Sequence, residues 1–339
     1  MIGIGLLGAG RIARTHAKAI SAAGGRLVTV YDVVESAAKS LAADAGASVA
    51  QSVEEVFDRP DVGAVLVATS SNTHVELIIK AVQAGKAVMC EKPLAPNLAD
   101  AQRCVEVLGS KASSVFLGFN RRFDAGHSGL KKSIDRGEIG NLEQLTITSR
   151  DPAPPPLDYI PNSGGLFRDM MIHDFDMARW MLGEEPVRIY SCGSCVVDPE
   201  IGKLGDIDTA CVTMVTQSGK QAIILNSRRA VFGYDQRIEA FGSAGMVISD
   251  NPRATGVKRY SSTSFGAPDR IFTFFMDRYG ESYRKEIETF LGGLESGTPP
   301  PVNSIDGLQA TYLADAAGAS LRMGRAIELK ANAEPTWHE

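Results

Sequence analysis

The 339-residue sequence has little of several features that mark specialised classes of protein. It contains five cysteines, an odd number in a long chain, so a framework of disulfides is not expected. Its 35 lysines and arginines are outnumbered by 40 acids, which excludes the basic surface of a typical nucleic-acid-binding protein. No apolar run reaches the roughly 18 residues that a membrane-spanning helix requires. The sequence therefore indicates a soluble globular protein that contacts neither nucleic acid nor membrane.

The start of the chain and the spacing of the cysteines indicate a reducing compartment. The strand-like MIGIGLLG at residues 1–8 lacks the basic region and cleavage site of a secretory signal. Cys192 and Cys195 form a C-x-x-C motif, but no second pair has the spacing of a zinc site. Two small residues in a strand explain the motif, and a structural or redox use is the alternative. We therefore expect a cytoplasmic protein without a metal site.

A glycine-rich motif follows the first predicted strand, residues 2–7, and has the pattern G-x-G-x-x-A ending at Ala13. The first glycine permits a tight turn, the second lets the backbone approach a pyrophosphate, and the small third residue lets the helix pack on the strand. A helix predicted over 11–23 would direct its N-terminal amides at the phosphates. The residues expected at a dinucleotide are Gly8, Gly10, Arg11 and Ile12.

An acidic residue, Asp32, ends the second predicted strand and lies 22 residues after Gly10. That distance is typical of the acid that binds the ribose of NAD. A carboxylate accepts hydrogen bonds from the 2′-hydroxyl, whereas it repels the 2′-phosphate of NADP by on the order of 4 kcal/mol per unit charge at about 4 Å. The pattern therefore predicts NAD in preference to NADP.

Alternating strand and helix patterns continue to about residue 118. Apolar strands are predicted at 64–69, 87–90 and 115–118, and helices at 37–45, 54–57, 72–84 and 98–108. This alternation predicts an α/β domain over residues 1–120, with a doubly wound Rossmann sheet. Ligands of such sheets bind at the carboxyl ends of the strands. The residues at those ends include Thr69, Ser70, Asn72, His74, Glu91 and Lys92.

Lys92 stands between a buried strand and Pro93 in the tripeptide Glu91-Lys92-Pro93. Proline fixes its own φ and restricts the residue before it, which favours an ammonium aimed into the cofactor crevice. A cation there can orient a substrate hydroxyl and favour its deprotonation. A salt bridge to Glu91, or a lysine at a helix start, is the alternative.

The rhythm of strand and helix changes after about residue 120. Strands are predicted at 142–149, 187–197, 209–216, 221–229, 236–241 and 246–249, and helices at 124–136, 168–182, 279–294 and 304–325. We expect residues 121–339 to form an α+β domain, with an open, mainly antiparallel sheet flanked by helices on one face. The uncovered face would carry Ile223 and Leu225, which predicts an interface between subunits.

Two ionisable residues lie in the stretch 164–180, which reads GGLFRDMMIHDFDMARW. Its glycines, with Gly183 beyond it, predict one capped helix of about four turns. Asp169 and His173 are four residues apart and would share a face of that helix. They are a plausible proton-transfer pair, because histidine titrates near neutral pH and a carboxylate can orient it. A surface salt bridge is one alternative, and a metal site with Asp176 is another.

Several polar residues are candidates for contact with a substrate. The Pro-rich segment 150–165 runs directly into the stretch that carries Asp169, so we expect it to form the wall of the pocket. Asp151 and Tyr159 from this segment can bond to polyol hydroxyls, as can Tyr234 and Arg122 from elsewhere in the chain. A purely structural role is the alternative for each.

These motifs together resemble the Gfo/Idh/MocA family of oxidoreductases over almost the whole chain. The resemblance rests on GLLGAGRIARTHAKAI at 5–20, AGKAVMCEKPLA at 84–95, GFNRRFD at 118–124 and the D-x-x-x-H at 169–173. Within the family, the branch of inositol 2-dehydrogenases is the most similar. That similarity lies in the segments at 168–180, 205–214 and 226–243.

The resemblance implies a catalytic group of Lys92, Asp169 and His173. His173 would take the proton from the hydroxyl being oxidised, Lys92 would lower the pKa of that hydroxyl, and Asp169 would bind a substrate hydroxyl and support the histidine. The family also implies that Thr69, Asn72 and His74 line the nicotinamide and ribose, and that the protein is a homotetramer. Ser70-Ser71 departs from relatives that carry a proline-containing turn there.

The sequence thus predicts an NAD-dependent dehydrogenase that oxidises a ring hydroxyl of a cyclic polyol. Myo-inositol, giving 2-keto-myo-inositol, is the first substrate to test, followed by scyllo-inositol and aldohexoses. An aldohexose dehydrogenase, an NAD-retaining glycosidase and a non-catalytic dinucleotide-sensing regulator are the alternatives. The presence of Lys92, Asp169 and His173 together argues against the regulator.

Overall fold

The computed structural model describes residues 2–337, and these form two compact units. The first unit comprises the chain up to Phe123 together with Gly280–Thr311. The second comprises Asp124–Tyr279 together with the chain from Tyr312. The first unit thus includes a later segment that the predicted boundary after residue 120 assigns to the second domain. None of the described helices is long and apolar enough to cross a membrane.

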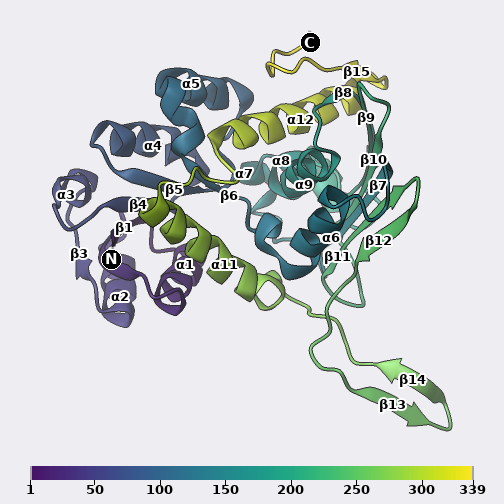
Figure 1. Cartoon of the computed structure of the whole chain (residues 1–339), viewed down its shortest axis with the longest axis horizontal. Helices are drawn as coiled ribbons and strands as arrows, with labels where there is room; N and C mark the ends of the chain where they lie inside the picture. The colour runs from purple at the N-terminus through teal and green to yellow at the C-terminus, as the bar shows by residue number, and fades with distance from the viewer. Residues whose placement is uncertain (1, 338–339) are drawn as a thin grey trace. The chain divides into compact units, whose positions relative to one another are not determined.

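A six-stranded parallel sheet forms the centre of the first unit, in the order β3-β2-β1-β4-β5-β6 (Figure 1). Its strands are β1 (Gly3–Leu7), β2 (Arg26–Tyr31), β3 (Ser48–Val49), β4 (Ala64–Val67), β5 (Ala87–Glu91) and β6 (Phe116–Gly118). The connecting elements are α1 (Arg11–Ala22), α2 (Glu35–Ala45), α3 (Val53–Asp58), η1 (Ser71–Thr73), α4 (His74–Gln83), α5 (Leu98–Leu108) and η2 (Gly109–Ser114), and η3 (Asn120–Phe123) follows β6. The order reverses between β1 and β4, where such sheets bind their ligands. The predicted Rossmann sheet is confirmed.

The sequences of these elements explain their places. Every residue of β1 and β4 is buried, as strands covered by helices on both faces require. Helix α1 buries Ala13, Ala17 and Ile20, which recur at the spacing of one helix face. The glycine turn between β1 and α1 therefore lies at the carboxyl edge of the sheet.

A seven-stranded sheet forms the centre of the second unit, in the order β12-β11-β7-β10-β9-β8-β15. Its strands are β7 (Leu142–Arg150), β8 (Pro186–Ser194), β9 (Thr209–Thr216), β10 (Gln221–Ser227), β11 (Asp235–Gly242), β12 (Gly245–Ser249) and β15 (Ile327–Glu328). Only β7 and β10 pair in parallel. The helices of this part of the chain are α6 (Ala125–Asp135), α7 (Ile160–Ser163), α8 (Gly165–Asp169), α9 (Ile172–Leu182) and α10 (Pro199–Lys203). Two longer helices, α11 (Phe275–Ser296) and α12 (Ser304–Met323), each have residues in both units. A separate hairpin pairs β13 (Lys258–Ser261) with β14 (Ser264–Pro268). The predicted open, mainly antiparallel sheet is confirmed.

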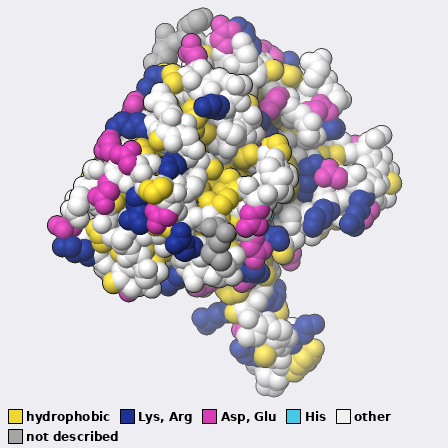
Figure 2. Space-filling model, turned by 60° about the vertical axis from the view of Figure 1, so that its left-hand side comes forward, with side chains coloured by type: hydrophobic (Ala, Val, Ile, Leu, Met, Phe, Trp, Pro, Cys, Tyr) yellow, Lys and Arg dark blue, Asp and Glu magenta, His cyan; other side chains and the backbone are white. Residues whose placement is uncertain are grey.

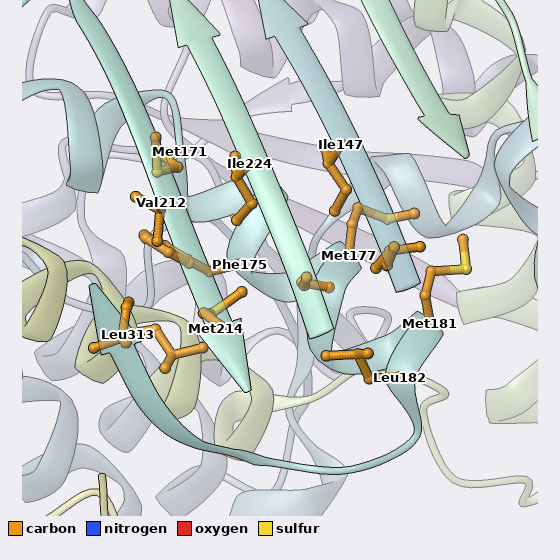
Figure 3. Close-up of a cluster of buried hydrophobic side chains, with 14 of the residues drawn as sticks. Ile147, Met171, Phe175, Met177, Met181, Leu182, Val212, Met214, Ile224 and Leu313 are labelled. Carbon is orange, nitrogen blue, oxygen red and sulfur yellow. The ribbon is translucent and has the colours of Figure 1, made fainter. Parts of the chain in front are cut away.

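The core of the second unit lies between this sheet and helix α9 (Figure 3). Ile147, Val212 and Ile224 project from three neighbouring strands toward Phe175 and Met177 of α9. All five side chains are at most 1% exposed. Burial of one such side chain stabilises the fold by roughly 1.5–3 kcal/mol, so α9 is held firmly in place.

The other face of the sheet carries accessible side chains. Residues of β9 and β10 alternate between buried and accessible, as one covered face requires. Ile223 is 37% exposed and Leu225 is half-buried, so both lie on the predicted uncovered face. Tyr190, Thr213 and Ile223 form one row across β8, β9 and β10 on that face.

The prediction of a single helix over 164–180 is wrong, because the structure has two helices there. Helix α8 ends at Asp169 and α9 begins at Ile172. The amides of Met170 and Met171 both bond to the carbonyl of Leu166, at 3.1 and 3.0 Å, which interrupts the regular ladder. Both methionines are buried, so the break is held by packing that a helical periodicity does not reveal. The predicted end is confirmed, since Gly183 caps α9 in the left-handed conformation.

Candidate active site

The glycine turn after β1 has the shape that a dinucleotide requires. Gly8 has φ of +102°, and a Cβ there would lie 2.4 Å from the carbonyl oxygen of Ala68. Gly10 is the N-cap residue of α1, and a Cβ there would meet nothing within 4 Å. Arg11 and Ile12 then open the helix, exposed and half-buried respectively. The turn is therefore tight at its first glycine and open at its second, which fits the pyrophosphate of NAD.

Asp32 is fixed beside this turn by two backbone amides. Its Oδ2 accepts from the amide of Ala9 at 2.7 Å, and its Oδ1 accepts from the amide of Val34 at 2.7 Å. Each carboxylate oxygen has further acceptor capacity. The carboxylate is therefore oriented at the end of β2, where a ribose hydroxyl can donate to it.

The loop after β4 contains the remaining predicted cofactor residues of that region. Ser70 and Asn72 are exposed and Thr69 is half-buried, with its Oγ1 2.7 Å from that of Thr73. His74 is 1% exposed, with Nδ1 2.8 Å from the carbonyl of Pro93 and Nε2 3.2 Å from the carbonyl of Thr69. Burial lowers the pKa of His74. This imidazole links the two loops at the carboxyl edge of the sheet.

The loop after β5 is anchored from beneath by Glu91. Its Oε1 lies 2.5 Å from Nε2 of the fully buried His16, a residue of α1. Its Oε2 accepts from the backbone amide of Lys92 at 3.1 Å. Glu91 is 7% exposed, so it holds the backbone of Lys92 rather than facing solvent. The arrangement fixes the start of the Lys92 side chain at the end of β5.

Glu286 lies near this anchor and was not predicted. It is fully buried, and no described residue bonds to either of its carboxyl oxygens. Burial, and then the charge of Glu91, raises the pKa of Glu286 well above its usual range. Tyr283, one turn earlier on α11, packs edge-on against His16 at 5.5 Å between ring centroids. No sequence pattern marks such a residue, because a glutamate on a helix is usually solvated.

Asp169 and His173 lie on either side of the break between α8 and α9. Asp169 ends α8, and its Oδ1 accepts from the hydroxyl of Tyr159 at 2.9 Å. His173 is the second residue of α9 and is half-buried, with its Nδ1 atom buried. The ring therefore presents its other edge outward.

Arg228 is the main residue of this region that the sequence analysis missed. It is 1% exposed, with Nη1 3.5 Å from Asp169 Oδ2 and Nη2 3.2 Å from Asp206 Oδ2. Asp206 in turn accepts from the amide of Leu166 at 2.9 Å, which ties the pair to the start of α8. A buried guanidinium thus holds the Asp169 carboxylate in place. The motif GDIDT at 205–209 and the arginine pair at 228–229 were the available signals.

The first turn of α9 is anchored through a second buried carboxylate, Asp174. Its two oxygens accept from Ser149 Oγ at 2.5 Å and from Asn226 Nδ2 at 2.9 Å. Asp174 is fully buried, and its partners belong to β7 and β10. Since His173 precedes Asp174 directly, these bonds fix the direction in which the imidazole leaves the helix.

The other predicted substrate residues lie in more varied surroundings. Arg122 is 8% exposed and donates to the carbonyl of Pro301 and to Asp306, both at 3.0 Å. Tyr234 is 7% exposed and packs edge-on against Tyr279. Asp151 is half-buried at the end of β7, Tyr159 is 46% exposed, and the latter bonds directly to Asp169. The structure therefore joins Tyr159 to a predicted catalytic residue.

Among the described residues, no group of three or more His, Cys, Asp or Glu side chains is placed to hold a metal ion. Asp176, a ligand in the metal alternative, is 1% exposed. A Rossmann sheet with its glycine turn and ribose acid defines instead a dinucleotide-dependent oxidoreductase.

Comparison with known proteins identifies the family. Residues 2–119 match the oxidoreductase family with an NAD-binding Rossmann fold, Gfo/Idh/MocA, and residues 127–248 match the C-terminal domain of the same family. The chain is a member of the Gfo/Idh/MocA family of NAD-binding oxidoreductases.

Several relatives match almost the whole chain. The inositol 2-dehydrogenase of Rhizobium meliloti is 45% identical over 96% of this chain and 98% of its own length. The myo-inositol 2-dehydrogenase of Thermotoga maritima is 46% identical, with the same coverage. The crystal structure of a myo-inositol dehydrogenase from Corynebacterium glutamicum superposes with a TM-score of 0.94, at 42% identity over 97% of this chain and 99% of that one. A scyllo-inositol dehydrogenase from Lactobacillus casei, with bound NAD(H) and scyllo-inositol, superposes with a TM-score of 0.89 at 28% identity over 97% of this chain and 99% of that one.

Proposed function

We propose that this protein is an NAD-dependent inositol dehydrogenase that oxidises one ring hydroxyl of myo-inositol to the 2-keto compound. Scyllo-inositol is the second substrate that we propose for this enzyme. The observation that carries the proposal is Asp169, held by Tyr159 and Arg228, four residues before His173 in a chain with a dinucleotide turn. Relatives that carry the names of inositol dehydrogenases support the choice of substrate.

His173 is proposed as the general base. Its half-buried ring takes the proton from the ring hydroxyl while the hydrogen on the same carbon leaves as a hydride. A base in this position contributes about 10²–10⁴-fold to the rate. The bonds of Asp174 to Ser149 and Asn226 support the role, because they hold the first turn of α9 rigidly.

Lys92 and Asp169 are proposed to complete the catalytic group. The Lys92 ammonium would stabilise the alkoxide that forms as the proton leaves, since an adjacent positive charge lowers the pKa of a hydroxyl. Asp169 would accept from a neighbouring hydroxyl of the polyol, with its orientation set by Arg228 and Tyr159. Bound NAD supplies the hydride acceptor at nicotinamide C4.

Cofactor binding is assigned to the carboxyl edge of the first sheet. Gly8, Gly10, Arg11 and Ile12 would hold the pyrophosphate, and Asp32 the ribose hydroxyls, which accounts for NAD rather than NADP. The proposed nicotinamide side comprises Thr69, Ser70, Asn72, His74, Glu91 and Lys92. His74 contacts the carbonyls of Pro93 and Thr69 and so links the two loops, which supports a role in holding the nicotinamide-side residues in place.

Substrate contacts beyond the catalytic group are proposed for Tyr159, Asp151, Tyr234 and Arg122. Tyr159 has the best support, because its hydroxyl already bonds to Asp169. Tyr234 and Arg122 are at most 8% exposed, so a contact with the substrate would involve only the small accessible part of each side chain.

The protein is further proposed to be a homotetramer of the cytoplasm. The uncovered sheet face carries large accessible side chains, which favours burial against a second copy. These side chains include Tyr190, Ile223, Phe241, Met246 and Ile248. All five cysteines are free, as a reducing compartment maintains them.

The purified protein, assayed with inositol isomers and aldohexoses against NAD and NADP, tests the function. We expect NADH to accumulate with NAD and myo- or scyllo-inositol. If the protein oxidised only an aldohexose, its substrate class would be a sugar instead of an inositol. NAD binding without turnover of any polyol or sugar would overturn the enzyme assignment in favour of a regulator, and glycoside cleavage without free NADH would favour the NAD-retaining hydrolase.

A further inference from the structure

A row of polar side chains lies buried against α9, the helix that carries His173. On the face shown in Figure 2, lysine, arginine, aspartate and glutamate side chains are spread over the surface, where water solvates them. Asn226, Ser149 and Gln236 are instead at most 2% exposed. Burying a polar group costs free energy unless the group is hydrogen-bonded. The bonds of this row should therefore explain why it is polar.

The three residues come from neighbouring strands and lie side by side across the second sheet. Ser149 of β7 is paired with Asn226 of β10 on one side and with Gln236 of β11 on the other. The next row on the same face, two residues along each strand, is apolar and belongs to the core: Ile147, Ile224 and Ile238. The covered face thus changes from apolar to polar beneath the first turn of α9.

Asp174, in that first turn, accepts hydrogen bonds from two members of the row. Its Oδ1 accepts from Ser149 Oγ at 2.5 Å, and its Oδ2 accepts from Asn226 Nδ2 at 2.9 Å. The shorter distance is typical of a hydroxyl that donates to a carboxylate. A serine hydroxyl has a single proton, so Ser149 cannot donate to a second acceptor at the same time.

The contact between Ser149 and Gln236 therefore needs its donor on the glutamine. Gln236 Oε1 lies 3.0 Å from Ser149 Oγ, while Gln236 Nε2 is buried and has no hydrogen-bond partner among the described residues. A half-turn of the amide exchanges these two atoms and leaves the shape of the side chain unchanged. Nε2 then donates to Ser149 Oγ. The oxygen moves to the other position, where a carbonyl without a donor is better tolerated than an N–H group without an acceptor.

We propose that Gln236 is a positioning residue for His173: its side-chain amide donates to Ser149, and Ser149 thereby gives its proton to Asp174. Because Asp174 directly follows His173 in α9, this chain of bonds fixes the direction in which the imidazole leaves the helix. The backbone amide of Gln236 donates to Asn251 Oδ1 at 2.7 Å, which holds the glutamine in place. The role rests on the proposed function, since it concerns the base of that reaction.

A double-mutant cycle in chemical unfolding tests the bond between Gln236 and Ser149 without any need for turnover. Gln236→Met keeps the length of the side chain and removes its amide, and Ser149→Ala removes the hydroxyl. We expect the two substitutions to be coupled by about fivefold in the unfolding equilibrium constant, the contribution of one hydrogen bond. Independent effects of the two substitutions would overturn the bond. A parent that oxidises no inositol would overturn the proposed function, and the cycle would still decide whether the bond exists.

Gln236→Glu tests the direction of the bond and its effect on catalysis. A protonated carboxyl can donate to Ser149 as the amide does, whereas an ionised carboxylate only accepts and draws the Ser149 proton away from Asp174. The ratio of variant to parent kcat should be close to one at low pH. It should fall about tenfold as the pH rises and the new carboxyl ionises, because a displaced base reacts more slowly, while the Kd for NAD stays unchanged. A ratio that does not depend on pH would overturn the proposal.

Two controls separate this effect from that of a bare negative charge. In a Ser149→Ala background, Gln236→Glu should give a ratio that does not depend on pH, because no hydroxyl is left to turn. Gln217→Glu is the matched control, since Gln217 is exposed in the turn between β9 and β10, at the other end of β10 from Asn226. It should keep the parent's kcat at every pH. A tenfold fall in either control would overturn the relay through Ser149.

Gln236→Met keeps the proposal testable if Gln236→Glu does not fold. Loss of the amide should lower kcat about tenfold and leave the Kd for NAD unchanged, because the first turn of α9 is then held less firmly. A folded Gln236→Met protein with the parent's kcat would overturn the positioning of His173 by Gln236.

Discussion

Replacement of Arg228 gives the sharpest test of how Asp169 is held. The guanidinium lies 3.5 Å from Asp169 and 3.2 Å from Asp206 and is 1% exposed. At an effective dielectric of about 20, each pair contributes roughly 5 kcal/mol of Coulomb energy, most of which offsets desolvation. Arg228→Met removes the buried cation that two carboxylates share, which should lower the free energy of unfolding by about 3–5 kcal/mol.

Arg228→Lys isolates the positioning effect from the loss of charge. A lysine keeps the positive charge but has one compact ammonium, which cannot serve both carboxylates with the geometry of a guanidinium. Asp169 then loses a fixed orientation, and displacement of a substrate-positioning group by about 1 Å costs on the order of 10²-fold. We expect kcat/KM for inositol to fall about 10²-fold in Arg228→Lys, while the Kd for NAD stays unchanged.

The assay is the initial rate of NADH formation, with NAD affinity measured separately by ligand-induced quenching of protein fluorescence. Arg229→Met provides the matched control, since Arg229 is the exposed neighbour in sequence. It should leave both stability and kcat/KM near the parent values. A folded Arg228→Lys protein with the parent's kcat/KM would refute the positioning of Asp169 by Arg228.

Substitutions of His173 and Asp32 test the proposed site, and a substitution of Glu286 tests the buried acid near Glu91. His173→Ala should reduce kcat by about 10²–10⁴-fold while NAD still binds, and unchanged turnover would remove the general-base assignment. Asp32→Ala should raise the kcat/KM ratio of NADP to NAD, measured with saturating inositol; a variant still unable to use NADP would contradict the ribose role. Glu286→Gln should have the parent's stability below about pH 4.5 and should be more stable than the parent above it. The difference should grow by up to tenfold in the unfolding equilibrium constant for each pH unit. The reason is that the folded parent keeps the proton of this buried acid, whereas the unfolded parent releases it. Thermal melts with the same pH dependence in both proteins would contradict the buried, protonated state of Glu286.

The parts of the fold that the sequence predicted are those set by local pattern. The apolar runs of β4 and β5 predict buried strands because nearly every residue in them is apolar, and the glycine turn predicts its own shape from Gly8 and Gly10. Asp32 was assigned beside the turn from its spacing alone, and the amide of Ala9 does bond to it. Short-range rules therefore suffice for the edge of the first sheet.

The parts that the sequence did not predict depend on distant partners. The break follows Asp169, where Met170 is 6% exposed and Met171 packs into a core that strands elsewhere in the chain complete. Arg228 pairs with Asp206, 22 residues earlier, and although GDIDT at 205–209 and the arginine run at 228–229 stand out in the sequence, neither motif specifies that the two meet. The hairpin at 258–268 was not predicted either, since its mostly polar sequence has no apolar alternation.

The two units support their proposed reactive side chains in the same physical way. Behind Lys92, the fully buried His16 holds Glu91, and Glu91 holds the Lys92 amide. Beside His173, the fully buried Asp174 bonds to two strands, much as the buried Arg228 holds Asp169. Hydrogen bonds of charged groups are strongest where water is excluded, so buried partners orient a reactive group more firmly than exposed ones. Substitutions at these buried partners should therefore reduce turnover while leaving every proposed substrate-contacting side chain intact.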